Sequence, residues 1–269
     1  MYAFAMKLAV DIGRTTFTRK TLCALVTAIF VASFAFAGED SELLSNKEAS
    51  SFDAPIKKTI IDFGPARQFE NHPEYRATLV CYYYPRLMIK EYDDFSPGAV
   101  LSILSRQGKL PACNRVPQRG ERAVRDGLGY LKGVKDALVF FDAGETFNGE
   151  LGFDIYDSVS GKKIFGDSAY TSGNFRVVSA QDGYVLKYLR VVDADCNLHL
   201  KGRACWSRIK AQFDLTTDDI PVCTGYEHIA EVVGTDDVES RIAYPVEVTL
   251  APRPIVKVLA GETKCWASQ

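Results

Sequence analysis

The side chains with the most readily interpreted chemistry in this 269-residue chain are its cysteines. Cys23 lies in an apolar stretch near the N-terminus, and the other six follow at Cys81, Cys113, Cys196, Cys205, Cys223 and Cys265. Such thiols serve as metal ligands or nucleophiles, or they oxidise to disulfides in exported proteins. A zinc site using His199 is the weaker interpretation, because no C-x2-C or H-x3-H pair is present. The even number therefore predicts three disulfides.

Position in the chain favours particular pairs, although six cysteines allow fifteen pairings. Cys81 and Cys113 stand apart from the other four and are expected to pair with each other. The preferred remaining bridges are Cys196–Cys205, which closes a short loop, and Cys223–Cys265, which fastens the C-terminal tail. The rival arrangement joins Cys205 to Cys223 and Cys196 to Cys265.

Three consecutive tyrosines form the main candidate for a binding surface. On a strand, Tyr82 and Tyr84 share one face, and Tyr83 lies on the other. One face must belong to the core, so the hypothesis is that Tyr82 and Tyr84 present aromatic rings to a sugar or a protein partner. The alternative is that both faces pack between two sheets.

No motif indicates catalysis, a metal or a cofactor. The histidines His72, His199 and His228 lack metal-ligand spacing, and there is no G-x-S-x-G motif. Aspartate pairs such as the one at 193 and 195 follow no calcium-loop pattern. We therefore assign no catalytic, cofactor-binding or metal residue and predict no cofactor. A hydrolase remains an alternative, because a catalytic triad can be assembled from residues distant in sequence.

The first 37 residues have the order of a secretory signal peptide. Basic side chains at 14, 19 and 20 precede an apolar run at 22–36, and Ala35 and Ala37 occupy the small-residue positions of a cleavage site. The run is shorter than the ~20 residues that a membrane-spanning helix needs. We expect cleavage after Ala37 and a periplasmic or secreted mature protein with no membrane span.

Composition narrows the function of the remaining chain. Residues 1–37 hold four of the 32 basic and one of the 34 acidic side chains, so the rest carries a net charge of −5. Without a basic cluster, a nucleic-acid partner is not expected. Residues 38–54 are polar and Ser-rich, which predicts a flexible leader. Residues 55–269 are expected to form a single β-rich domain, or two closely packed halves.

Strand signals dominate this domain. Residues 78–89 are rich in β-branched and aromatic side chains, with Pro85 as a break or edge marker. Residues 242–250 alternate apolar with other side chains, and Pro245 is expected at an edge or an irregular position. Runs joined by turn signals predict hairpins, at 149–156 with 162–165 and at 175–179 with 184–192.

Two short helices are expected between the strands. The first spans 96–108, with Ser96 as N-cap, Pro97 at the first helical position and Gly108 at the end. The second spans about 204–214, where apolar side chains recur every four residues. The predicted fold is therefore mainly β, an antiparallel β-sandwich or a system of twisted sheets with hairpins and two short peripheral helices.

These features favour an exported, disulfide-braced binding protein, for an envelope glycan or a protein partner. A hydrolase and a structural envelope or assembly protein are the alternatives. A deep pocket with convergent polar side chains would favour an enzyme, and a shallow exposed aromatic strip would favour a binding protein. A long, unprotected edge strand would favour assembly.

Overall fold

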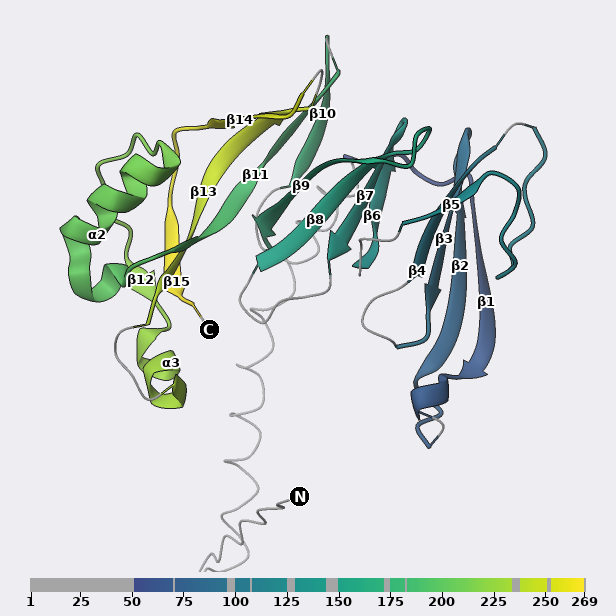
Figure 1. Ribbon diagram of the computed structural model, residues 1–269, viewed down its shortest axis with the longest axis horizontal. Helices are drawn as coiled ribbons and strands as arrows, with labels where there is room; N and C mark the ends of the chain where they lie inside the picture. Colours follow the sequence, from purple (N-terminus) through teal and green to yellow (C-terminus); the bar gives the residue numbers. More distant parts are fainter. Residues whose placement is uncertain are drawn as a thin grey trace, which may run out of the picture. The chain divides into compact units, whose positions relative to one another are not determined.

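The computed structural model describes residues 51–69, 71–95, 100–106, 108–124, 129–143, 150–171, 175–181, 183–233, 238–250 and 253–268. These residues form two sheets and two helices (Figure 1), which confirms a mainly β fold with two short helices. No helix in the described part is long and apolar enough to cross a membrane. The expected signal peptide and most of the expected leader lie outside the described residues.

The first sheet is an antiparallel meander whose strands lie in chain order. It contains β1 (Lys57–Pro65), β2 (Arg76–Tyr83), β3 (Leu87–Asp93), β4 (Val100–Ser105) and β5 (Glu121–Ala123), with the short 3-10 helix η1 (Arg67–Phe69) between β1 and β2. Pro85 divides the tyrosine-rich run, because it lies in a tight turn in which Tyr84 N donates to Leu87 O at 2.8 Å. Pro85 therefore acts as the break that the sequence indicated.

The second sheet is larger, and its strand order is β12-β15-β13-β11-β9-β8-β7-β6, with β10 on β11 and β14 on β13. Both expected hairpins are confirmed, as β8 with β9 and as β10 with β11. Asp182, in the second turn, lies outside the described residues. The strands of this sheet are β6 (Gly129–Lys135), β7 (Leu138–Ala143), β8 (Glu150–Asp157), β9 (Lys163–Tyr170), β10 (Arg176–Ala180), β11 (Gly183–Ala194), β12 (Cys223–Thr224), β13 (Ser240–Thr249), β14 (Ile255–Val258) and β15 (Lys264–Ala267).

The first expected helix was wrong, because Val100–Ser105 is the strand β4. Leu101 and Ile103 pack on one face of this strand, and Leu104 packs on the other. Burial on both faces removes the strict alternation of a half-buried strand, and Val100, Leu101 and Leu104 then stand at helical spacing in the sequence. Residues 96–99 and 107 lie outside the described part.

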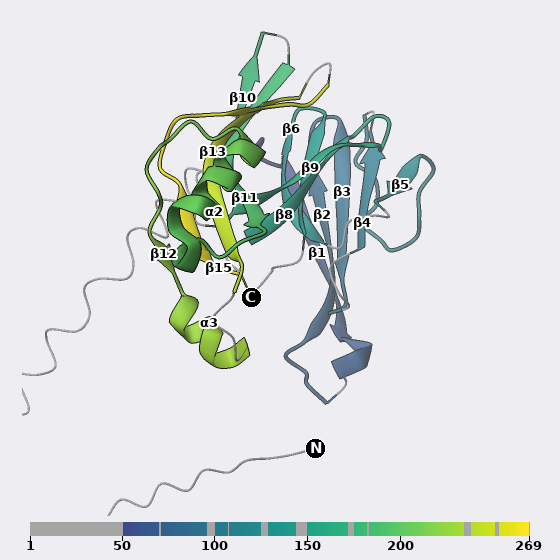
Figure 2. The same ribbon diagram turned by 60° about the vertical axis from the view of Figure 1, so that its left-hand side comes forward.

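The second expected helix is confirmed, because it is the part of helix α2 (Leu198–Phe213) that follows a kink at Gly202, where φ is 44° and ψ is −119°. Helix α2 starts after Asn197, whose side chain accepts from Leu200 N at 2.8 Å, and ends at Asp214 in a left-handed conformation. A further helix, α3 (Tyr226–Val233), was not predicted. Figure 2 shows α2 lying across the β13 and β15 part of the second sheet, where its Trp206 and Ile209 join the core.

The two sheets share one of the cores. Leu87, Ile89, Leu101 and Ile103 of the first sheet pack together with residues of β6, β7 and β8. Strand β7 is buried on both faces, because its alternate residues enter two separate clusters. This packing explains why residues 138–141 read as an unbroken apolar run.

Pro245 lies where the strand beside β13 changes. Its carbonyl accepts from Leu259 N at 2.9 Å. Because the N and C=O groups of one residue point to the same side of an antiparallel strand, the missing N–H of Pro245 is on the side of β14 and β15. There β14 ends its pairing at Val258, and β15 begins at Lys264. The expected irregularity is therefore present, and it leaves the β11–β13 ladder intact.

Three disulfides join the expected partners. They are Cys81–Cys113, Cys196–Cys205 and Cys223–Cys265, with Cα–Cα distances of 5.9, 5.9 and 4.4 Å. The preferred pairing is thus confirmed over its rival. The first bridge fastens the chain after β4 across the outer face of the first sheet, where Tyr83 also donates to Pro111 O at 3.0 Å.

The packed part of the chain begins before the expected boundary at residue 55. The Phe52 ring lies 5.1 Å from that of Phe140, and Asp53 N donates to Val134 O at 2.7 Å. A Cβ on Gly133 would lie 2.4 Å from the Phe52 ring, so the glycine leaves room for this contact. Residues 51–54, assigned to the leader by composition, are therefore part of the domain edge.

Candidate functional site

A pocket of 980 Å³ lies where several hairpin turns meet, and we call it the turn pocket. Its volume is in the range of small-molecule sites. Its walls are formed by the turn after β2, the end of β4, the turns between β6 and β7 and between β8 and β9, and the start of β11. Its lining residues are Asp53, Tyr84, Pro85, Arg86, Ser105, Arg106, Val134, Asp136, Ala137, Ser158, Val159 and Tyr184.

Local turn chemistry positions these side chains. Asp136 occupies a left-handed conformation with φ of 53°, which aspartate tolerates in a tight turn. The backbone N–H of this residue donates to Asp53 Oδ2 at 2.6 Å, and Lys135 Nζ lies 3.0 Å from Asp53 Oδ1. Ser158 N donates to Ala137 O at 2.8 Å, which joins the two turns of the second sheet. The wall formed by these turns is therefore held by hydrogen bonds.

Tyr184 places a phenol against the same wall. Its hydroxyl donates to Asp136 Oδ2 at 2.8 Å. Burial raises the pKa of Tyr184, and the neighbouring Asp136 carboxylate raises it further. The phenol therefore stays protonated at neutral pH and holds the Asp136 carboxylate in place.

The first sheet adds Arg106 and Tyr84 to the lining of the pocket. Arg106 donates from Nη2 to Gly108 O at 3.2 Å, while its buried Nε and Nη1 have no hydrogen-bond partner among the described residues. Tyr84, which is 4% exposed, lines the same pocket. Burial, with smaller contributions from Tyr82 and Asp53, raises the pKa of Tyr84 to about 12. Both groups are thus donors at neutral pH.

The two tyrosines selected from the sequence occupy different environments. Tyr84 lines the turn pocket. Tyr82 is half-buried, with its hydroxyl 3.5 Å from Glu91 and the Lys58 ammonium 4.9 Å from its ring centre. Burial, followed by the nearby Glu91, raises the pKa of Tyr82 to about 12. A binding role for this face stays a prediction, and only Tyr84 contributes to the turn pocket.

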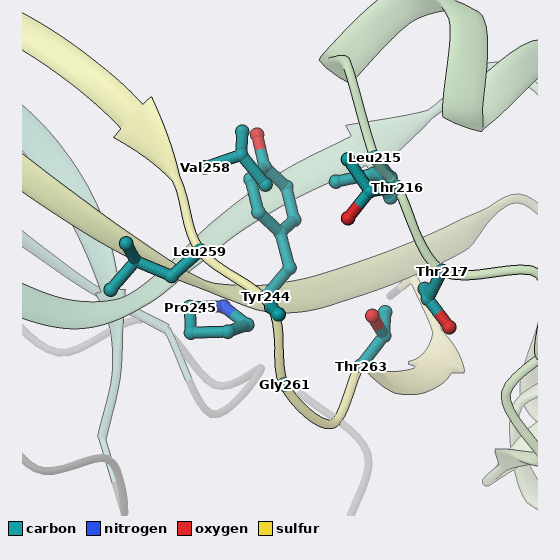
Figure 3. Close-up of a pocket in the computed structure, with 10 residues that line it drawn as sticks. Leu215, Thr216, Thr217, Tyr244, Pro245, Val258, Leu259, Gly261 and Thr263 are labelled. Atoms are coloured by element: carbon teal, nitrogen blue, oxygen red, sulfur yellow. The ribbon is translucent and has the colours of Figure 1, made fainter.

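Two smaller pockets belong to the second sheet. One of 430 Å³ lies beside Pro245, between the segment after α2 and the segment joining β14 to β15. Figure 3 shows Tyr244 standing upright in it, with Leu215 and Thr216 on one side and Val258 on the other. No charged side chain lines it among the described residues. The other pocket, of 150 Å³, is lined in part by an ion pair in which Lys132 Nζ lies 3.1 Å from Asp142 Oδ1.

No metal-ligand cluster is found in the described part of the chain. Cys196 and Cys205 are bonded to each other, and the ring of His199 stacks on Tyr226 at 4.9 Å. The three residues of the zinc interpretation are therefore engaged elsewhere. Comparison with family models, curated proteins and solved structures found no match.

Sequence reasoning did not identify Arg106, Asp136 or Tyr184 as site residues. They stand far apart along the chain, and no short motif contains any of them. Tyr184 stood at the start of an expected strand after a turn signal, whereas Arg106 fell inside the helix expected at 96–108, so the sequence held no common signal for these residues. The structure brings the three residues together in one pocket.

Proposed function

We propose that this chain is an exported, disulfide-braced binding protein whose turn pocket takes a small ligand bearing a carboxylate together with hydroxyl or amino groups. The observation that carries the proposal is the buried Nε and Nη1 of Arg106, which have no hydrogen-bond partner among the described residues and lie in a 980 Å³ pocket that Tyr84 also lines. A guanidinium presents a fork of N–H groups that matches a carboxylate. Leaving the Arg106 Nε and Nη1 groups buried and unbonded is unfavourable, so a ligand that accepts hydrogen bonds from them gains affinity.

Two carboxylates in the same lining suit the remaining part of such a ligand. Asp136 and Asp53 supply carboxylate oxygens that can accept from hydroxyl or amino groups, and Tyr184 and Lys135 hold these carboxylates in place. A sugar acid and a zwitterionic amino acid both carry this combination of acceptor and donor groups. A neutral sugar lacks the carboxylate that Arg106 would bind.

Binding fits the protonation of these groups better than proton transfer does. A guanidinium does not lose its proton in proteins. Tyr84, with a pKa of about 12, stays protonated at neutral pH. Export is supported by the signal-like order of residues 1–37 and by the three disulfides, which form in oxidising compartments.

Isothermal titration calorimetry with the mature protein tests this proposal. The probes are D-glucuronate, its neutral counterpart D-glucose, and L-glutamate as the zwitterion. We expect one of the two acids to bind and glucose to bind at least tenfold more weakly, because a hydrogen bond to a charged group contributes about 1.5–3 kcal/mol. If neither acid binds at millimolar concentration, or if glucose binds equally well, the proposal is refuted.

Matched variants assign the binding to the pocket. Arg106→Gln is expected to weaken binding of the acid about tenfold or more, and Tyr84→Phe more modestly, because each removes a donor. Arg119→Gln is the control, since Arg119 is exposed and does not line the pocket. Unchanged affinity in Arg106→Gln would place the binding site elsewhere.

A further inference from the structure

Strand β1 forms a free edge of the first sheet. It has nine residues and is the longest described strand with a neighbour on one side only. No backbone hydrogen bond on its outer side is found in the described part of the chain. The outer side of β6, by contrast, is partly covered, because Val134 O accepts from Asp53 N and Leu131 N donates to Glu91 Oε2.

The pairing of β2 shows which backbone groups of β1 face outward. Tyr84 N donates to Leu87 O, so Tyr84 faces β3 and the preceding Tyr83 faces β1. The backbone groups of successive β2 residues point alternately toward β1 and β3. The β2 residues that point toward β1 are paired with Lys57, Thr59 and Ile61 of β1. The N–H and C=O groups of the intervening residues, Lys58, Ile60 and Asp62, therefore point away from the sheet.

The outer side of β1 is complementary to itself. In an antiparallel pair centred on Ile60, the outward groups of Ile60 meet those of Ile60 of the partner subunit, with two hydrogen bonds at the pair. Lys58 then lies opposite Asp62 of the partner subunit, and Asp62 opposite Lys58 of the partner subunit. All three residues have outward-facing backbone groups, and the side chains of each Lys58–Asp62 pair have opposite charges.

The side chains on both faces also match this register. Ile60 is 60% exposed and would be covered by its own copy. On the other face, Lys57 would lie opposite Phe63 of the partner subunit, a ring that is 45% exposed in one chain. A lysine beside an aromatic ring adds a favourable cation–π contact.

We propose that two copies of this chain associate through their β1 strands, in antiparallel register centred on Ile60, to form one continuous sheet. The turn pocket plays no part in this association, so the proposal is independent of the proposed ligand. A contact of one strand pair lies at the small end of protein interfaces, so the dimer is expected to be weak, with a dissociation constant on the order of 10–100 µM.

Sedimentation equilibrium of the mature chain over a concentration series tests the association. Ile60→Lys is expected to weaken dimerisation at least tenfold, because it places like charges at the two-fold axis. Val222→Lys is the control, since Val222 is 87% exposed and lies outside the edge. A chain that stays monomeric at about 200 µM, or a dimer that Ile60→Lys leaves unchanged, overturns the proposal; the concentration is chosen above the expected dissociation range.

A charge exchange tests the register itself. Lys58→Asp and Asp62→Lys are each expected to weaken the dimer, and the double variant is expected to restore it, since opposite charges face each other again. A double variant as weak as the single variants excludes this register. Thermal melts of all three verify that the monomer remains folded, because Asp62 also pairs with Arg76 at 2.6 Å.

Crosslinking tests directly whether the β1 strands of two copies lie side by side. All six cysteines in the described residues are bridged, so Ile60→Cys adds a single free thiol at the proposed axis. We expect this variant to oxidise to a covalent dimer much faster than Ile255→Cys, which is 62% exposed on the edge strand β14. Equal rates for the two variants would show that a different surface, or none, associates.

Discussion

Replacing Lys90 by Met is expected to lower the free energy of unfolding by about 3–5 kcal/mol, the range for removing one member of a buried ion pair. Lys90 Nζ lies 2.7 Å from Glu121 Oε2, and the two side chains are only 5% and 10% exposed. Lys90 also donates to Val116 O at 3.1 Å. The variant would leave the Glu121 carboxylate buried without its cation.

The other contacts of Glu121 show why the loss should be large. Ser102 Oγ donates to Glu121 Oε1 at 2.6 Å, and Gln118 N donates to Oε2 at 2.8 Å. These hydrogen bonds stabilise the ionised carboxylate, and the Lys90 ammonium compensates its charge. In the double variant with Glu121→Gln, no unpaired charge remains, so its loss should fall below the sum of the single losses by at least about 1 kcal/mol.

The pH dependence follows from the same pair. Burial alone would raise the pKa of Glu121, but hydrogen bonds from Lys90, Ser102 and Gln118 outweigh it and leave the pKa lowered. The carboxylate therefore stabilises the fold above its unfolded-state value near 4.5, and this contribution is lost as pH falls through the lower folded value. Glu121→Gln should flatten the decline of stability in acid.

Urea denaturation followed by circular dichroism measures these differences. The control is Lys163→Met, because Lys163 pairs with Asp154 at 2.6 Å but is 45% exposed. Its loss should stay within about 1 kcal/mol. If Lys90→Met loses no more than the control, or if the two single losses add without coupling, the interpretation of this pair as a mutually dependent buried unit is refuted.

Three further outcomes are expected. Phe52→Ala should lower the free energy of unfolding by about 2–3 kcal/mol, somewhat less than for a fully buried phenylalanine, and a loss near zero in urea denaturation would show that residues 51–54 do not belong to the folded unit. Burial raises the pKa of Glu91, so ionisation of this carboxyl opposes folding. Glu91→Gln should therefore become more stable relative to the native chain as pH rises above the unfolded-state pKa near 4.5, and equal pH profiles of stability for the two proteins would contradict this. Replacing Cys223 and Cys265 by serine should lower stability by about 2–4 kcal/mol in the same assay, and an unchanged midpoint would speak against a stabilising bridge.

The sequence predicted the strands and bridges best where local signals agreed with tertiary packing. The alternation in β13 and the turn signals of the β8–β9 and β10–β11 hairpins were sufficient to place those strands. The positions of the cysteines favoured the disulfides that form, although the sequence left a rival pairing of four of them open. The failure at β4 has the opposite cause, since Leu101, Ile103 and Leu104 are buried on two faces and two-faced burial removes the alternation by which a strand is recognised.

The candidate site could not be predicted in the same way, because its residues share an end of the fold and no stretch of the chain. Tyr84 was selected as part of an aromatic face, yet its partner in the pocket is Arg106 at the end of β4 and not Tyr82. In an antiparallel meander every second turn returns to the same end of the sheet. Tyr84 follows β2 and Arg106 follows β4, and these two strand ends lie at the same end of the sheet because the chain turns back at Pro85 into β3. Functional residues in a β protein of this kind are therefore better sought by counting turns to one end of the predicted sheets than by searching for contiguous motifs.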